Sequence, residues 1–290
     1  MTRPLWLVAA PGIFLLLWSA GFAVAKIGLL HAGPFTLLGL RYLIAVLVLL
    51  PLIPILKPPL PGRRAALDIA ITGFLIQVVY FGLCYIAFRS GVSAGGVAII
   101  VCLQPILVSL VAPKLVGERI SPLRWLGLAL GLAGALTVIL ARSGISTEPV
   151  LGVLAAIGGL IGITAGTLYE KRFGTAQHPV PANIIQYGVG ALFALPLAVF
   201  VEGLNADWSA EFPAVMAYLV IGNSLVAITL LLAMIRAGEV ARVSALFYLV
   251  PPLAALFAWP LLGETMPPLA WAGMALAALG VMLARSGPAA

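Results

Sequence analysis

Long uninterrupted apolar runs constrain this chain more than any other feature. Each run has about the 20 residues that a helix needs to cross the hydrocarbon core of a bilayer. Because the apolar residues are continuous and do not alternate with polar ones, the runs predict helices and not the strands of a membrane barrel. The ten runs lie at roughly 5–29, 34–56, 66–89, 93–116, 122–141, 150–171, 180–201, 213–235, 241–263 and 268–285.

Charged residues are too few to cover a soluble fold. Only 9% of the 290 residues are charged and 63% are hydrophobic, whereas a soluble domain has about 25% charged residues. All loops between the runs are short, so function must lie within the membrane bundle. The net charge of +7 forms no basic stripe, so we expect a lipid bilayer and no nucleic acid as partner. We predict an all-α polytopic membrane protein with ten transmembrane helices.

The distribution of Lys and Arg predicts the orientation. If the N-terminus is inside, twelve of the sixteen Lys and Arg residues fall in cytoplasmic loops or helix ends. Cytoplasmic loops carry such an excess, which predicts that both termini are cytoplasmic and that the chain is a multi-pass protein of the inner (plasma) membrane. Arg3 and the sequence Ala23-Val24-Ala25 resemble a signal peptide, but the apolar run is too long for one.

The two halves of the chain resemble each other. The segment LVGERISPLRWLGLALGLAG at 115–134 and the segment LLGETMPPLAWAGMALAALG at 261–280 agree at ten of twenty positions. We therefore predict two repeats, at 1–145 and 146–290, each with five helices. An odd number of helices forces the second repeat to lie upside down in the membrane. Such inverted repeats are typical of transporters, with the substrate site near the midplane between them.

These doubled segments resemble the repeat signature of the drug/metabolite transporter superfamily, and more narrowly its EamA-type branch of ten-helix exporters. The sequence Trp18-Ser19-Ala20-Gly21-Phe22 and the pair Arg41-Tyr42 are also similar to what that family shows. The resemblance covers essentially the whole chain. It implies ten helices in two inverted repeats that work by alternating access, and the export of amino acids, other metabolites or drugs. The overall sequence is also similar to the bacterial aromatic amino-acid exporters of this family.

Polar and aromatic side chains inside the spans are the candidate substrate ligands, because a polar group in hydrocarbon needs a partner. Gln77, Tyr80, Cys84 and Phe88 share one face of the predicted third helix. An amide beside rings suits an amphipathic ligand, although each polar group can equally bond a neighbouring helix. We predict a cavity lined by helices one, three, four, six, eight and nine. The predicted substrate contacts are Trp18, Gln77, Tyr80, Gln104, Asn223 and Tyr248.

Matched prolines mark candidate gates. Pro105 in the fourth span and Pro251 in the ninth lie 146 positions apart, the offset of the repeat. A proline inside a helix removes a hydrogen bond and bends the helix, so we predict paired bends that serve as hinges, with fixed structural kinks as the alternative. Glycines at four-residue spacing, such as Gly127 and Gly131, predict close helix contacts instead of a site.

The charged residues narrow the mechanism. Arg41 lies inside the second span, where it either snorkels to the outer interface or meets a substrate carboxylate, and we favour the anchor. No Asp or Glu reaches the middle of a predicted span, so we expect facilitated transport. Proton coupling, with Glu170 as its best candidate, remains the alternative.

We predict a transporter that exports small amphipathic metabolites, foremost amino acids, aromatic ones among them, and that functions as a monomer. No nucleotide-binding loop, metal-ligand spacing or catalytic cluster occurs in the sequence, so we expect no cofactor, no metal and no enzymatic activity. An exporter of drugs, a channel and an intramembrane enzyme are the alternatives. A channel is disfavoured because the inverted repeat indicates alternating access.

Overall fold

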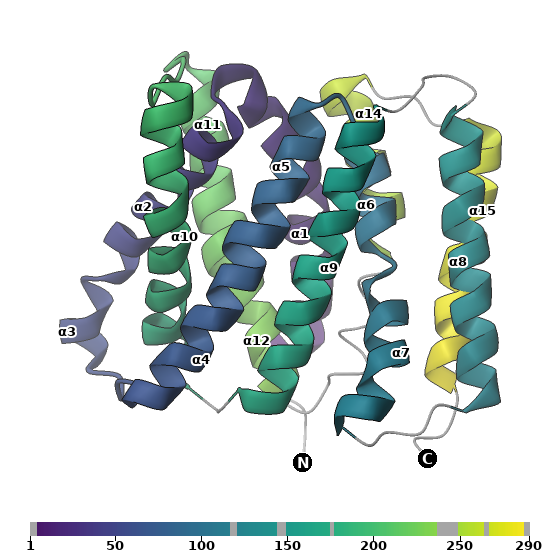
Figure 1. The fold of residues 1–290 in the computed structure, drawn as a ribbon, viewed down its shortest axis with the longest axis horizontal. Coiled ribbons are helices and arrows are strands. Elements are labelled where there is room, and N and C mark those ends of the chain that lie inside the picture. The colour runs from purple at the N-terminus through teal and green to yellow at the C-terminus, as the bar shows by residue number, and fades with distance from the viewer. Residues whose placement is uncertain are drawn as a thin grey trace.

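The chain folds into a bundle of helices (Figure 1). The computed structural model describes residues 5–116, 121–143, 149–174, 177–236, 249–263 and 267–286. Six of its helical segments are long and apolar enough to cross a membrane, and four shorter apolar helices occupy the predicted fourth, fifth, ninth and tenth spans. The elements are α1 (Leu5–His31), α2 (Pro34–Leu49), α3 (Leu52–Leu56), α4 (Arg63–Gly73), η1 (Phe74–Tyr80), α5 (Phe81–Arg89), α6 (Ala94–Val101), α7 (Gln104–Val116), α8 (Pro122–Ser143), α9 (Val150–Phe173), α10 (Pro179–Glu202), α11 (Glu211–Ala217), η2 (Tyr218–Ala227), α12 (Ile228–Arg236), α14 (Val250–Leu262) and α15 (Pro268–Ser286).

The third helix of each half contains a π-helical stretch. Helices α4 and α5 are joined without a break by η1, and α11 and α12 are joined in the same way by η2. Gln77 lies in η1 and Asn223, 146 positions later, lies in η2. A π-helical turn holds more residues than an α-helical turn, so the side chains that follow it are rotated about the helix axis. The sequence repeat thus extends to a matched backbone irregularity.

The predicted fourth span is two helices. Helix α6 ends at Val101 and α7 begins at Gln104, with a turn at Cys102 and Leu103 between them. The expectation that Pro105 bends a continuous helix is therefore wrong. Pro105 is the second residue of α7, a position where its missing N–H costs no helical hydrogen bond. Pro251 is likewise the second residue of α14.

Some helices at equivalent positions of the two repeats pack against each other. Others pack against equivalent partners in the opposite repeat. Helix α2 packs on α10, and α8 packs on α15. Helix α1 packs on α14 and on η2, whereas α9 packs on α6 and α7 and on η1 and α5. In Figure 1, α1 rises from the lower to the upper edge, while α9 descends. Matched helices thus run in opposite directions, as an inverted repeat requires, and the exact boundary between 145 and 146 stays a prediction.

Glycines let the paired helices touch backbone to backbone. A Cβ atom at Gly134 would collide with the backbone of α15, and a Cβ atom at Gly280 would collide with the backbone at Gly127 and Gly131. On α9, a Cβ atom at Gly162 would lie 3.0 Å from Tyr80 N in the backbone of η1. The interpretation of the glycine spacing as a signal for close helix contact is confirmed.

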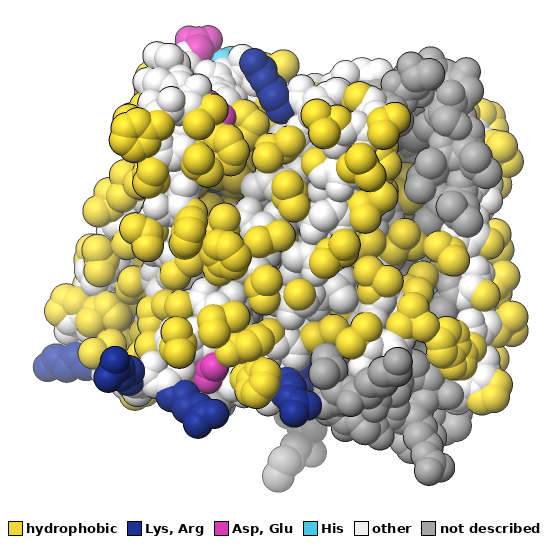
Figure 2. All heavy atoms as spheres, viewed as in Figure 1, with side chains coloured by type: hydrophobic (Ala, Val, Ile, Leu, Met, Phe, Trp, Pro, Cys, Tyr) yellow, Lys and Arg dark blue, Asp and Glu magenta, His cyan; other side chains and the backbone are white. Residues whose placement is uncertain are grey.

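The surface separates into an apolar flank and two polar rims (Figure 2). The flank is formed by exposed side chains such as Phe200 and Leu197, which suits contact with lipid. The α3–α4 connection and the end of α9 lie at the lower edge and carry Lys57, Arg63, Arg64, Lys171 and Arg172. The α10–α11 connection at the upper edge carries Glu202, Asp207 and Glu211.

Candidate functional site

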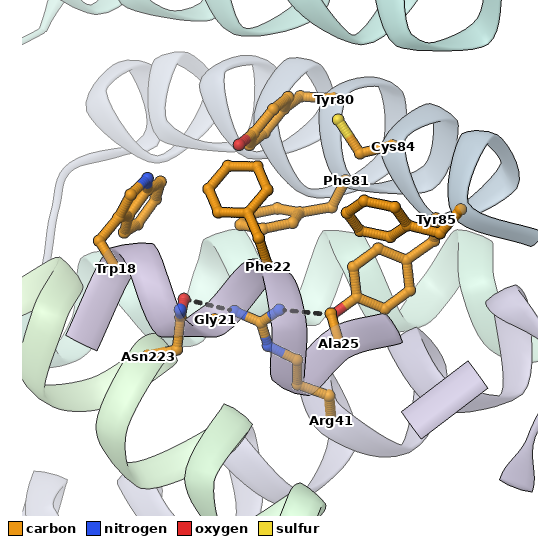
Figure 3. Close-up of a pocket in the computed structure, with 11 residues that line it drawn as sticks. Trp18, Gly21, Phe22, Ala25, Arg41, Tyr80, Phe81, Cys84, Tyr85 and Asn223 are labelled. Atoms are coloured by element: carbon orange, nitrogen blue, oxygen red, sulfur yellow. Dashed lines mark hydrogen bonds between the residues drawn. The ribbon is translucent and has the colours of Figure 1, made fainter. Parts of the chain in front are cut away.

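A pocket lies between α1, α2, α5 and η2 (Figure 3). Its free volume is about 20 Å³, room for roughly one water molecule, so the pocket in this conformation is too small for a metabolite. Most of its wall is aromatic, with Trp18, Phe22, Tyr80, Phe81, Tyr85 and Phe88. The remaining lining residues are Gly21, Ala25, Arg41, Cys84 and Asn223.

Arg41 supplies the charge of the pocket. The side chain is only 1% exposed, and its guanidinium points between Asn223 and Tyr85 in Figure 3. Arg41 Nε donates to Ser224 Oγ at 2.8 Å, one terminal nitrogen donates to Tyr85 OH at 3.1 Å, and the other donates to Asn223 Oδ1 at 3.2 Å. The guanidinium also lies over the ring of Phe81, 4.7 Å from its centroid. The interpretation of Arg41 as an anchor that snorkels to the interface is wrong.

Carboxylates in the described part of the chain bond elsewhere. Asp68 accepts from Tyr169 OH, and Glu170 accepts from Thr72 Oγ1. Glu202 caps α2, while Asp207 and Glu211 contact His31. None of these five carboxylates is a hydrogen-bond partner of Arg41. The partners of Arg41 among the described residues are therefore neutral hydroxyl and amide groups and aromatic rings.

The aromatic residues pack as a connected wall. Trp18 lies 5.5 Å from Phe14 and 6.3 Å from Phe81, measured between ring centroids. Phe88 meets the edge of Phe22 at 6.5 Å. Rings at such distances attract each other and present apolar faces to a ligand. The pocket wall is therefore mainly apolar, and Arg41 and Asn223 are polar residues within it.

Two tyrosines outside the pocket lining stabilise the helices that form it. Tyr42 and Tyr187 stack with centroids 5.8 Å apart, and both are buried. Tyr42 OH donates to Gln77 O at 2.7 Å, and Tyr187 OH donates to Ser224 O at 2.6 Å. Both acceptors are π-helical carbonyls, so each hydroxyl stabilises the irregular turn in the third helix of its own repeat. Ser224 in turn accepts from Arg41, which ties the support to the charge.

The structure brings three of the predicted contact residues to the pocket. Trp18, Tyr80 and Asn223 line it. Gln77 and Gln104 are buried outside the lining, and Gln104 Nε2 donates to Thr167 Oγ1 at 2.7 Å. Pro105 and Pro251 begin helices that do not line this pocket, and their hinge role stays a prediction. Tyr248 falls outside the described residues.

Eight of the eleven lining residues were not predicted as ligands, and Tyr85, Phe81 and Arg41 show why. Tyr85 lies one position off the predicted face of the third helix, and Phe81 was not named although it follows Gln77 by four positions. The π-helical stretch ends at Tyr80, so Phe81, Cys84, Tyr85 and Phe88 form one face of the α-helix that follows. Arg41 was considered, but nothing in the sequence revealed its bonds to the second half.

Polar contacts join the two halves at both edges of the bundle. At the upper edge, His31 Nε2 lies 3.0 Å from Glu211 Oε2, and Asp207 N donates to His31 O at 2.8 Å. At the lower edge, Thr72 Oγ1 donates to Glu170 Oε2 at 3.1 Å and Tyr169 OH donates to Asp68 Oδ1 at 2.8 Å. The two halves are thus tied together by polar contacts at each edge of the bundle.

A bundle of apolar helices with an apolar flank and an amphipathic pocket has the architecture of a membrane transporter. The model of the EamA-like transporter family matches the chain twice, at residues 6–140 and 150–286, and the chain belongs to that family.

Known relatives span nearly the whole chain. The uncharacterized inner membrane transporter YedA of Escherichia coli is 28% identical over 94% of this chain and 88% of its own length. A probable amino-acid metabolite efflux pump of Salmonella typhimurium is 25% identical over 93% of this chain and 92% of its own. A crystal structure with 22% sequence identity matches with a TM-score of 0.73 over 95% of this chain and 98% of its own, which shows the same fold.

Proposed function

We propose that this transporter exports small amphipathic metabolites, foremost amino acids, by alternating access. The observation that carries the proposal is the pocket itself, where an aromatic wall faces Arg41 and Asn223 between helices of both halves. Ring faces pack the apolar part of such a ligand and the polar end orients it. The name of the Salmonella relative, a probable amino-acid metabolite efflux pump, supports the same substrate class.

The proposal includes an orientation and a location. The lower edge, with Lys57, Arg63 and Arg64, faces the cytoplasm of a cell whose inner membrane holds the protein, and both termini lie on that side. The name of YedA, an inner membrane transporter, supports this location. We further propose a functional monomer, because both repeats of one chain contribute to the pocket.

Transport is proposed to be facilitated. No carboxylate is among the residues that line the pocket, so the described site offers no group there for a coupling proton. Glu170, held by Thr72 at the lower edge, is the residue through which proton coupling would act instead. A pH gradient across the membrane separates the two mechanisms.

Counterflow in proteoliposomes tests the proposal. Vesicles that contain the purified protein and unlabelled L-phenylalanine should accumulate labelled L-phenylalanine transiently, and an imposed pH gradient should leave the initial rate unchanged. Saturable counterflow requires a carrier, whereas flux that never saturates and shows no counterflow would indicate a channel. A rate that follows the pH gradient would overturn the facilitated mechanism alone.

Trp18→Ala should reduce this counterflow roughly tenfold or more, because the indole buries its apolar surface in the pocket wall. Trp259→Ala is the matched control, since Trp259 is 60% exposed on the flank. Both variants should elute as monodisperse protein in detergent. Equal flux in the wild type and Trp18→Ala would remove the assignment of this pocket as the substrate site.

A further inference from the structure

Arg41 keeps hydrogen-bonding capacity that its protein partners do not use. A guanidinium has five N–H donors. The bonds to Ser224, Tyr85 and Asn223 account for three of them, one on each nitrogen. Each terminal nitrogen therefore retains a second N–H beyond these bonds, on a side chain that lines the pocket.

The charge of Arg41 is also not balanced by its partners in the described structure. Hydroxyl and amide oxygens accept hydrogen bonds but carry no net charge, and the ring of Phe81 offers only a cation–π contact. A buried cation inside a membrane is costly unless an anion pairs with it. A carboxylate matches the planar guanidinium in shape as well as charge, because two oxygens meet two parallel N–H groups.

The helix packing itself does not demand this charge. The counterpart of Arg41 in the second half is Gln186, 145 positions later, a neutral residue at the equivalent place of α10. A polar side chain that only joins helices needs no positive charge there. The charge is specific to the half that carries the aromatic wall, and this coincidence of charge and wall indicates a ligand.

We propose that Arg41 binds the carboxylate of the transported molecule and thereby restricts the substrates to small amphipathic carboxylates. The inference rests on the proposed function and names the substrate class of the same pocket. The carboxylate lies on the free side of the guanidinium, and the apolar body of the substrate lies along Phe22, Phe81 and Trp18. Amides and amines of the same shape lack the anion and are rejected.

Asn223 and Tyr85 act as positioning residues for Arg41. Each accepts one N–H from a terminal nitrogen, which fixes the plane of the guanidinium. Asn223 is itself held by its Nδ2 group, which donates to Leu17 O at 3.3 Å. Contacts from both halves of the chain thus fix the direction of the remaining N–H groups of the Arg41 guanidinium.

Matched ligands of one shape test the assignment. Proteoliposomes with the wild-type protein are offered labelled 3-phenylpropanoate, L-phenylalanine, L-phenylalaninamide and 2-phenylethylamine. The two carboxylates should move at least about tenfold faster than the amide and the amine, the difference expected for one charge-assisted interaction. Arg41→Gln, which installs the residue of the second half, should lower flux of the carboxylates roughly a hundredfold and flux of the amide by less than about threefold.

Binding is measured independently of transport. In detergent, 3-phenylpropanoate should raise the Tm of the wild type and leave the Tm of Arg41→Gln unchanged. Arg63→Gln, at the exposed start of α4, removes a surface charge as the matched control and should behave as the wild type in both assays. Arg41→Lys should retain part of the carboxylate flux, since it keeps the charge and loses the fork.

Three outcomes would overturn the inference. The first is equal wild-type flux of the acid and the amide. The second is an equal loss of both in Arg41→Gln, which would make Arg41 a structural residue only. The third is stabilisation of Arg41→Gln by 3-phenylpropanoate. If the wild type moves none of the four compounds but 3-phenylpropanoate still stabilises it through Arg41, the proposed transport of this class fails while the carboxylate site stands.

Discussion

In the first half of the chain Tyr42 donates to a π-helical carbonyl of the third helix, and in the second half Tyr187 does the same. The two π-helical stretches, η1 and η2, begin 144 positions apart, close to the offset of the sequence repeat. The backbone support of the pocket is therefore present twice, and the two copies meet where the tyrosine rings stack.

The side chains that face the pocket differ between the halves. In α5 they are Phe81, Tyr85 and Phe88, and the residues 146 positions later are Ala227, Leu231 and Met234. Among the described residues that line the pocket, ten belong to the first half and Asn223 belongs to the second. In the described part of the chain the two copies thus share a π-helical stretch, while the aromatic side chains that line the pocket come from the first half. The difference separates residues that support the fold from residues of the proposed site.

Gly21 and Gly166, which lie at equivalent positions of the two repeats, should give the largest difference between an effect on substrate binding and an effect on stability. A Cβ at Gly21 would collide with the amide of Asn223, whereas a Cβ at Gly166 would meet the side chain of Ile76, 2.8 Å away. Gly21→Ala should displace Asn223, remove its bond to Arg41 and lower L-phenylalanine flux roughly tenfold. Gly166→Ala should cost about 1 kcal/mol of stability, because Ile76 must repack, and leave the half-saturating concentration unchanged.

Flux assays and melting curves of the same preparations decide the matter. If Gly166→Ala raised the half-saturating concentration as much as Gly21→Ala, the second half would contribute equally to recognition. The inference that the first half supplies most of the substrate contacts would then be wrong.

The tyrosine pair gives a smaller contrast. Removing either hydroxyl leaves a buried carbonyl without that donor, so Tyr42→Phe and Tyr187→Phe should each destabilise the protein by about 1 kcal/mol. Only Tyr187 bonds the residue whose hydroxyl holds Arg41, namely Ser224. Carboxylate flux should therefore fall about threefold in Tyr187→Phe, the effect of a partly lost hydrogen bond, and stay near wild type in Tyr42→Phe. A fall of the same size in both variants would show that the stacked pair acts as one unit.

The sequence predicted the large features of this fold because they depend on few interactions. An apolar run of span length has to form a helix in a membrane, since only a helix satisfies its backbone there. The repeat was visible as identical residues at a fixed offset. Trp18, Tyr80 and Asn223 were found because polar and aromatic residues at mid-span are rare enough to stand out.

The rest of the site depends on contacts between distant segments. The π-helical stretch η1 ends directly before Phe81, and no residue type marks such a stretch in the sequence. Arg41 reaches Asn223 and Ser224 across 182 and 183 positions. Its depth and partners follow from helix packing, which periodicity along one helix does not contain. Gln77 shows the reverse error, since its place on the predicted face did not bring it to the pocket.

The N-termini of the matched second helices offer the smallest test. Glu202, from the second half, accepts from Phe35 N at 3.0 Å and from Thr36 N at 2.7 Å at the start of α2. The start of α10 is capped locally, by Val180 N donating to His178 Nδ1 at 3.3 Å.

A carboxylate at a helix N-terminus also interacts with the helix dipole, so Glu202→Gln should lower stability by about 1 kcal/mol and His178→Ala by about half as much. Melting curves in detergent measure both losses. Because neither residue lines the pocket, the half-saturating substrate concentration should not change in either variant. A larger loss of stability in His178→Ala than in Glu202→Gln would mean that Glu202 stabilises α2 less than His178 stabilises α10. The charge of Glu202 would then contribute little to holding the two halves together.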